Sequence, residues 1–440
     1  MNLSRRDALL STLFGASYVG LRALATGLPA ALLLNPRRAL AGTGSAPCAA
    51  ASKAQFIIVN TSGQGDPINA SVPGTYDDPQ IVHSPDPSMA PAPLTIQGQQ
   101  YMAAAPWATL PQAVLDRTVF WHLMTNTPVH PKEPQVLQLM GATPSGEMLP
   151  SLLAKSLSAC LGTVQTQPIS VGAATPSEDL TFDGAPLPVI PAAALKATLT
   201  DPAGPISSLQ PLRDQTLNQL YDLYKNTASP AQKAYVDSLV TSQQQVRNIN
   251  QALLNQLSAI KDNSASSQVL AALALIQMNV TPVVAIHIPF GGDNHRDVGL
   301  ATETAQTVSG VATIASLMQQ LQAAGLEDKV TFMSLNVFGR TLGPSNTDGR
   351  QHNLNHQVSI TIGKPFKGGV IGGVAPVQSD YGAVNVNPQT GAGSPSGSIQ
   401  AVDTLAAFGM TMLASIGADP TVITAPKSSG AVIKAALHGS

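Results

Sequence analysis

Charge is scarce in this sequence. Only 11% of its 440 residues are charged, with 23 Lys and Arg against 25 Asp and Glu, so the formal net charge is −2. An ordinary globular protein has about 25% charged residues. Because nucleic-acid binding draws on a surplus of Lys and Arg, this balance excludes a nucleic-acid binder that works by charge. The 36 Gly and 35 Pro follow no period, which excludes collagen and indicates a folded core with many long loops.

The N-terminal segment lacks a hydrophobic run long enough to span a membrane. The apolar stretch Ala8–Leu21 has about 14 residues, whereas a spanning helix needs about 20. It follows the twin-arginine pair Arg5-Arg6, and Ala39-Leu40-Ala41 further on is an A-x-A cleavage site. We predict a twin-arginine signal peptide over residues 1–41, read by the twin-arginine translocase. The folded protein would then be periplasmic or secreted, without a stable transmembrane segment. An N-terminal membrane anchor is the alternative.

Cysteine is nearly absent, with Cys48 and Cys160 as the two examples. In an oxidising compartment they could pair and tie the N-terminal segment to the folded domain. Two free thiols agree with the sequence equally well. Residues 42–53 are predicted as a linker, and residues 54–440 as a single α/β domain.

Short apolar runs rich in β-branched residues alternate with helical segments along the chain. Such alternation predicts a mostly parallel sheet with helices on both faces, in a three-layer α/β/α sandwich. The Pro-rich segment 71–116 has few periodic apolar positions and is predicted as an extended loop. The predicted strands are Gln55–Asn60, Val119–Met124, Pro282–Pro289, Val330–Val337 and Gln357–Ile362, and the predicted helices are Pro134–Leu139, Met148–Leu161, Glu303–Ala324 and Val402–Ile416.

A long helical hairpin is expected as an insertion at about residues 209–277. Apolar residues recur at helical spacing from Val236 to Ile260, with Gln, Ser and Asn on the other face. The dipeptide Ser229-Pro230 would separate the two helices. The apolar stripe could pack over the sheet or bind a partner.

Polar side chains follow the predicted strands, where sites of parallel sheets usually lie. Imidazole and carboxylate groups supplied by several loops suit zinc, manganese or iron. Asp293 and His295 follow Gly291-Gly292, in a loop that could turn both side chains to one ion. A turn with its own local hydrogen bonds is the alternative. We predict one divalent metal, with the candidate ligands Asp293, His295, His352 and His356.

The same loops supply candidates for catalysis and substrate binding. Arg340 could hold an anionic substrate group through its planar guanidinium, or form a buried pair with a carboxylate. Ser62 and its neighbour Thr61 could expose a hydroxyl nucleophile, although such turns are common without one. The candidate substrate-binding residues are His130 and Arg350.

Five segments of the chain, together with its twin-arginine leader, resemble the exported domain-of-unknown-function 1501 family. The family motifs are G-G-x-D-G-L-N, G-W-D-T-H, S-E-F-G-R-T, G-x-D-H and G-G-x-x-G. The resemblance covers nearly all of the mature chain, and it implies a fold similar to the alkaline phosphatase and sulfatase superfamily. The matching segments are Gly65–Asn69, Gly291–His295, Asn336–Thr341, Gly349–His352 and Lys367–Gly373.

The resemblance also implies catalysis by one or two divalent metals, which activate a hydroxyl nucleophile and polarise a phosphoryl or sulfuryl oxygen. Two departures remove negative charge from such a site. Val337 stands where the family has an acidic residue, and Gln351 stands where it has Asp. The retained residues agree with one metal held by Asp66, Asp293, His295 and either His352 or His356, with Asp66 as ligand or base.

These observations leave three hypotheses. The first is a periplasmic metal-dependent hydrolase of phosphate or sulfate esters. The second is a catalytically degenerate member of the family that keeps the fold and binds an envelope partner or carbohydrate. The third is a structural component of the envelope, suggested by the low charge and the abundant Gly and Pro. The substrate and any envelope partner are not readable from the sequence.

Overall fold

The computed structural model describes Cys48, residues 51–200 and residues 251–439, apart from residues 164, 173–179 and 346, and a few single positions between 201 and 250. The predicted signal peptide, most of the predicted linker and, apart from those single positions, residues 209–250 of the predicted hairpin therefore lie outside the described residues.

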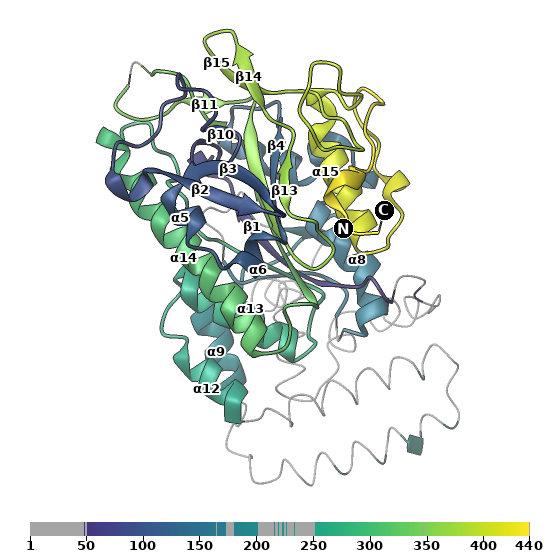
Figure 1. Ribbon diagram of the computed structural model, residues 1–440. Coiled ribbons are helices and arrows are strands. Elements are labelled where there is room, and N and C mark those ends of the chain that lie inside the picture. Colours follow the sequence, from purple (N-terminus) through teal and green to yellow (C-terminus); the bar gives the residue numbers. More distant parts are fainter. Residues whose placement is uncertain are drawn as a thin grey trace, which may run out of the picture.

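A seven-stranded sheet forms the centre of the fold (Figure 1). Its strand order is β13-β4-β12-β9-β1-β8-β5. The strand β12 is antiparallel to both of its neighbours, and the other pairs are parallel, so the predicted mostly parallel sheet is confirmed. The strands are β1 (Phe56–Ser62), β4 (Thr118–Leu123), β5 (Ile169–Ser170), β8 (Val283–Ile286), β9 (Val330–Asn336), β12 (Gln357–Ile362) and β13 (Gly369–Ile371).

Helices cover both faces of this sheet, as the alternation of strands and helices predicts. Successive residues of β1 point to opposite faces, because side chains alternate along a strand. Ile58 belongs to one apolar core with residues of α13 (Ala265–Gln277) and α14 (Ala301–Ala323). Ile57 and Val59 belong to the other core, with α8 (Leu149–Leu161) and α15 (Thr404–Ser415). Figure 1 shows these two pairs of helices on opposite sides of the sheet.

The prediction of an extended loop over residues 71–116 is wrong. This segment contains a β-hairpin, β2 (Pro91–Ile96) and β3 (Gln99–Ala104), followed by two short helices, α5 (Ala105–Ala108) and α6 (Gln112–Leu115). The prolines in this segment argue against a strand at the level of the sequence. An edge strand tolerates proline, because an N–H group that faces outward is not needed for pairing with a neighbouring strand.

Further short elements surround the sheet. Among them, η1, η3, β10 and β11 matter for the site below. The bounds are α7 (Glu133–Leu137), α9 (Ala192–Thr200), α12 (Gln251–Ala259), β6 (Thr181–Phe182), β7 (Ala185–Pro186), β10 (Gly339–Arg340), β11 (His352–Asn353), β14 (Val374–Val377), β15 (Asp380–Ala383), η1 (Pro67–Ala70), η3 (His130–Lys132) and η8 (Val298–Leu300).

Cys48 and Cys160 form a disulfide, with their Cα atoms 5.1 Å apart. The pairing settles the alternative that the sequence left open, and it ties Cys48 to the last turn of α8. Of the helices in the described ranges, none combines the length and the apolar character needed to cross a membrane.

Candidate metal centre

Four side chains converge at one edge of the sheet and could hold a metal ion. His130, Asp293, His295 and His352 each offer one ligand atom, and these atoms all lie within 4.8 Å of one another. His130 follows β4, and Asp293 and His295 follow β8. His352 precedes β12. Because β12 runs antiparallel, its amino end meets the carboxyl ends of the other strands, which explains why His352 reaches the same place.

Two of the histidines are oriented by main-chain carbonyl groups. His130 Nδ1 lies 2.8 Å from the carbonyl oxygen of Gly63, and His352 Nδ1 is hydrogen-bonded to the carbonyl oxygen of Pro128. A carbonyl oxygen only accepts, so in both rings Nδ1 carries the proton and Nε2 offers a lone pair. Histidine ligands of metals usually have this arrangement. The Nε2 atom of His130 is buried and has no hydrogen-bond partner among the described residues, as expected of an atom prepared for an ion.

The remaining two donors stand close to these lone pairs. His295 Nε2 lies 2.7 Å from His352 Nε2 and 3.2 Å from Asp293 Oδ1. Burial, with smaller effects of nearby cations such as Arg340, lowers the pKa of His352 to about 4. His352 is therefore neutral at neutral pH, which is the form that binds metal. The donor set of three imidazoles and one carboxylate fits zinc, manganese or iron.

Phe338 packs against two of these histidines. Its ring stacks on His352 at 4.3 Å between centroids and meets His130 edge-on at 4.9 Å. Gly65 permits this packing, because a Cβ atom there would stand 2.0 Å from the Phe338 ring. Gly65 also has a φ of +67°, which favours glycine.

Arg340 holds Asp293 and is fully buried. Its Nη2 atom donates to Asp293 Oδ1 at 2.9 Å and to the carbonyl oxygen of Gln64 at 2.7 Å, and its Nε atom donates to the carbonyl oxygen of Gly65. Burial alone would raise the pKa of Asp293, but the charge and hydrogen bond of Arg340 outweigh it and hold that pKa below its usual value. Of the two roles open for Arg340, this geometry matches the pair with a carboxylate.

His356 does not join the cluster, although the sequence suggested it as a ligand. It is fully buried, and its Nε2 atom lies 2.9 Å from Nδ1 of His122, whose Nε2 atom lies 2.9 Å from the carbonyl oxygen of Pro73. His122 therefore donates to Pro73 and accepts from His356. The remaining His356 atom, Nδ1, lies 3.2 Å from the amide nitrogen of Asn69. Both imidazoles are satisfied as neutral groups inside the protein.

Asp66 and Ser62, the other catalytic candidates, are buried beside the cluster, Ser62 as the last residue of β1 and Asp66 directly before η1. Asp66 Oδ1 accepts hydrogen bonds from the main-chain N–H groups of Gly292 at 2.8 Å and Phe290 at 3.4 Å, so it holds the loop that carries Asp293. Ser62 Oγ accepts from the N–H of Gln64 at 3.2 Å. Neither residue belongs to the group of four donors.

Arg350 lies away from the ligand atoms, in a buried ion pair with Glu303 of α14. Its Nε and Nη2 atoms donate to the two carboxylate oxygens at 2.7 and 3.0 Å. Its other donors reach the carbonyl oxygens of Thr341 and Val82, both at 2.8 Å. The guanidinium therefore fastens three loops to α14, and the substrate-binding role suggested by the sequence receives no support from this geometry.

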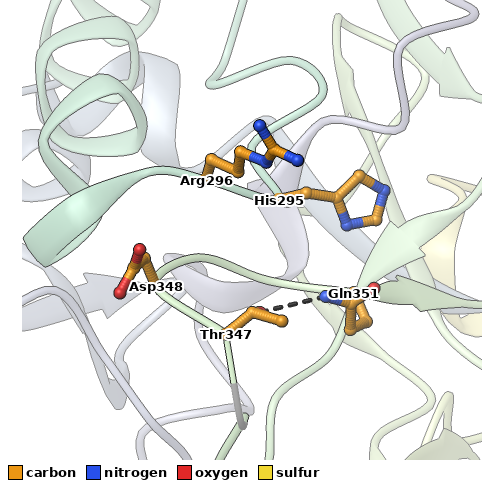
Figure 2. Close-up of a pocket in the computed structure, with 5 residues that line it drawn as sticks. All are labelled: His295, Arg296, Thr347, Asp348 and Gln351. Atoms are coloured by element: carbon orange, nitrogen blue, oxygen red, sulfur yellow. Dashed lines mark hydrogen bonds between the residues drawn. The ribbon is translucent and has the colours of Figure 1, made fainter.

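An open cleft of about 490 Å³ adjoins the cluster at His295 (Figure 2). The exposed Arg296 lines it, a residue that the sequence reasoning passed over although it directly follows a candidate ligand. The sequence also assigned His130 to substrate rather than metal. The lining residues are His295, Arg296, Thr347, Asp348 and Gln351.

No known family model matches the chain, and no curated protein matches it either. The resemblance to the domain-of-unknown-function 1501 family thus stays a prediction from the motifs.

Proposed function

We propose that this protein is an exported metal-dependent hydrolase of phosphate or sulfate esters, related to the domain-of-unknown-function 1501 family and similar in fold to alkaline phosphatases and sulfatases. The observation that carries the proposal is the convergence of three imidazoles and one carboxylate, two of the imidazoles being oriented by carbonyl groups. The cluster adjoins an open cleft, so a substrate can approach it.

The four candidate ligands and Arg340 have different roles in this proposal. His130, Asp293, His295 and His352 would hold the ion, and Arg340 keeps the Asp293 carboxylate ionised and in place. A divalent ion supplies Lewis acidity that polarises the ester and lowers the pKa of water.

Because Ser62 is the buried last residue of β1 and its hydroxyl oxygen accepts from the N–H of Gln64, we propose water as the nucleophile. The water oxygen bonds to phosphorus or sulfur, the bond from that atom to the ester oxygen breaks, and the alcohol leaves with a proton that comes from the attacking water. Arg296 is the exposed cation beside His295 that is available to the anionic ester.

A second candidate is an envelope protein that binds a ligand without turnover. It is favoured by Val337, which is fully buried in the apolar core where the resembled family has an acidic residue. Gln351, neutral where that family has Asp, lines the cleft. Both substitutions leave the site with less negative charge than a two-metal centre needs.

The test is elemental analysis of the protein purified without chelator or nickel affinity. We expect about one equivalent of zinc, manganese or iron, lost in the Asp293→Ala, His295→Ala variant. A matched variant, Asp77→Ala, His438→Ala, changes the same residue types at exposed positions outside the cluster and should keep the metal.

The metal-loaded protein is then screened against phosphate and sulfate esters. Turnover that disappears with the metal supports the hydrolase. Bound metal without turnover of any ester supports the second candidate, and no metal in either protein contradicts the metal centre itself.

A further inference from the structure

The cleft beside the cluster has a cation on one wall and an anion on the other. Figure 2 shows His295 and Arg296 along one segment and Thr347, Asp348 and Gln351 along the facing segment. Arg296 and Asp348 are both exposed. Within the described part of the chain neither side chain has a hydrogen-bond or ion-pair partner, and they are not paired with each other. Each can therefore pair with a group on a ligand without losing an existing contact.

The two walls are joined beneath the cleft by buried contacts. The N–H of Arg350 donates to the carbonyl oxygen of Asn294, and the Asn294 side chain donates to the Glu303 carboxylate that pairs with Arg350. Gly349 makes this approach possible, since a Cβ atom there would stand 1.8 Å from the Asn294 carbonyl oxygen.

Each wall is also fixed by itself. Asp297, next to Arg296, accepts from the N–H groups of Thr302 and Glu303 at the start of α14. On the facing wall, Thr347 Oγ1 donates to the carbonyl oxygen of Gly349. The backbones that carry the two charges are therefore held before any ligand binds, which reduces the entropy cost of binding.

We propose that this cleft selects zwitterionic esters, in which the alcohol part carries an ammonium group. The inference rests on the proposed function. Arg296 lies directly beside the ligand His295, so it pairs with the phosphate or sulfate, and Asp348 on the other wall pairs with the ammonium. Asp348 also repels esters with a second anionic group. The site therefore takes aminoalcohol esters in preference to polyanionic ones such as nucleotides.

The test compares two ligands that differ in one group. The probes are 2-aminoethyl phosphate and propyl phosphate, which have an ammonium and a methyl group at the same position, and the corresponding sulfates are tested in parallel. Their dissociation constants for the metal-loaded full chain are measured by calorimetry. Exposed ion pairs are weak, so we expect a preference of about threefold for the zwitterion, falling as salt is raised.

Variants of the two walls should change the binding of the two esters in different ways. Asp348→Asn should remove the preference, and Asp348→Lys should reverse it, while Arg296→Gln should weaken both esters about equally. The matched control is Glu327→Lys, the same change of charge at an exposed residue between α14 and the amino end of β9, the opposite edge of the sheet. It should leave the preference unchanged.

Binding is measured apart from turnover, so the two proposals can fail separately. Selective binding of the zwitterion without hydrolysis keeps the inference and removes the hydrolase. Hydrolysis without a preference removes the inference and keeps the hydrolase. The inference is also overturned if Asp348→Lys leaves the preference as it is, or if neither ester binds.

Discussion

At the scale of single residues, the surroundings of each imidazole decide whether it can bind a metal ion. From their positions after the strands, the sequence predicts that His130, Asp293, His295 and His352 lie at one edge of the sheet. The structure confirms that their side chains meet there. Position along the chain does not say where a side chain points. His356 stands only four residues after His352, yet it turns into the interior, where Asn69 and His122 satisfy it.

The buried His122 should make the fold sensitive to acid. Burial lowers its pKa from 6.5 to about 4 in the folded protein. The unfolded chain therefore binds a proton first as the pH falls, so this contribution to stability is complete above about pH 6.5 and is lost as the pH falls towards 4. We expect His122 to contribute a decrease of up to roughly 3 kcal/mol in the free energy of unfolding over that range, measured by urea titration at several pH values. His356, whose pKa burial also lowers, adds to the loss.

His122→Gln removes the titrating group and keeps a donor for Pro73. This variant should show a shallower loss of stability in acid, whereas His438→Gln, at an exposed position, should follow the parent. If the free energy of unfolding of His122→Gln falls with pH as steeply as that of the parent, other groups cause the acid sensitivity.

The Arg350–Glu303 pair should be among the costliest contacts to break. Both side chains are almost completely buried, at 3% and 1% exposure. Removing one partner leaves an uncompensated buried charge, so Arg350→Ala should lower the free energy of unfolding by about 3–5 kcal/mol. Urea unfolding measures this. Adding Glu303→Leu should recover part of the loss, and an additive double variant would show that the two residues do not act as a pair.

At the scale of elements, periodicity predicted the presence of strands but not their direction. The run Gln357–Ile362 was predicted with the bounds that β12 has. The connection from β9 to β12, residues 337–356, forms the antiparallel pair β10 and β11 instead of a crossover helix in its described residues, and β12 returns antiparallel to β9. Its reversal matters for function, because it carries His352 to the edge where β4 and β8 end.

The contact of η1 with β10 should control the metal centre at a distance. Asn69 of η1 accepts from the N–H of Arg340 at 2.9 Å and donates to its carbonyl oxygen at 2.7 Å, and Arg340 in turn holds Asp293. Asn69→Ala removes both bonds, and also the contact with His356 Nδ1, without changing any of the four candidate ligands. Residues that orient ligands typically contribute 10- to 100-fold in metal affinity, so we expect a loss of about that size in a competition titration.

The control for this prediction is Asn385→Ala, which also removes a side-chain amide that bonds to the backbone but belongs to the C-terminal loops. Its metal affinity should match that of the parent. If Asn69→Ala folds and binds metal as tightly as the parent, the contact with Arg340 does not position the cluster.

At the scale of the whole molecule, the disulfide joins parts of the chain that are far apart in sequence. Cys48 and Cys160 are separated by 112 positions, so the bond restricts a long segment of the unfolded chain, including β1 and β4. The sequence could not decide between a bond and two thiols, because the distance between Cys48 and the end of α8 depends on the tertiary fold. An exported chain would meet the oxidising compartment in which such bonds persist.

Removing this bond should destabilise the protein by about 2–5 kcal/mol, chiefly because the unfolded chain gains freedom. The free energy of unfolding is measured in urea for Cys48→Ser, Cys160→Ser and the double variant. The free energy of unfolding should fall by a similar amount in all three variants, since either change breaks the same bond. A reductant should lower the free energy of unfolding of the parent to the value of the variants and leave the variants unchanged. Because the four candidate metal donors lie at the far end of strands that the core already fixes, any bound metal should be kept in each variant. Loss of metal together with the disulfide would show instead that the N-terminal tie supports the edge of the sheet where the cluster lies.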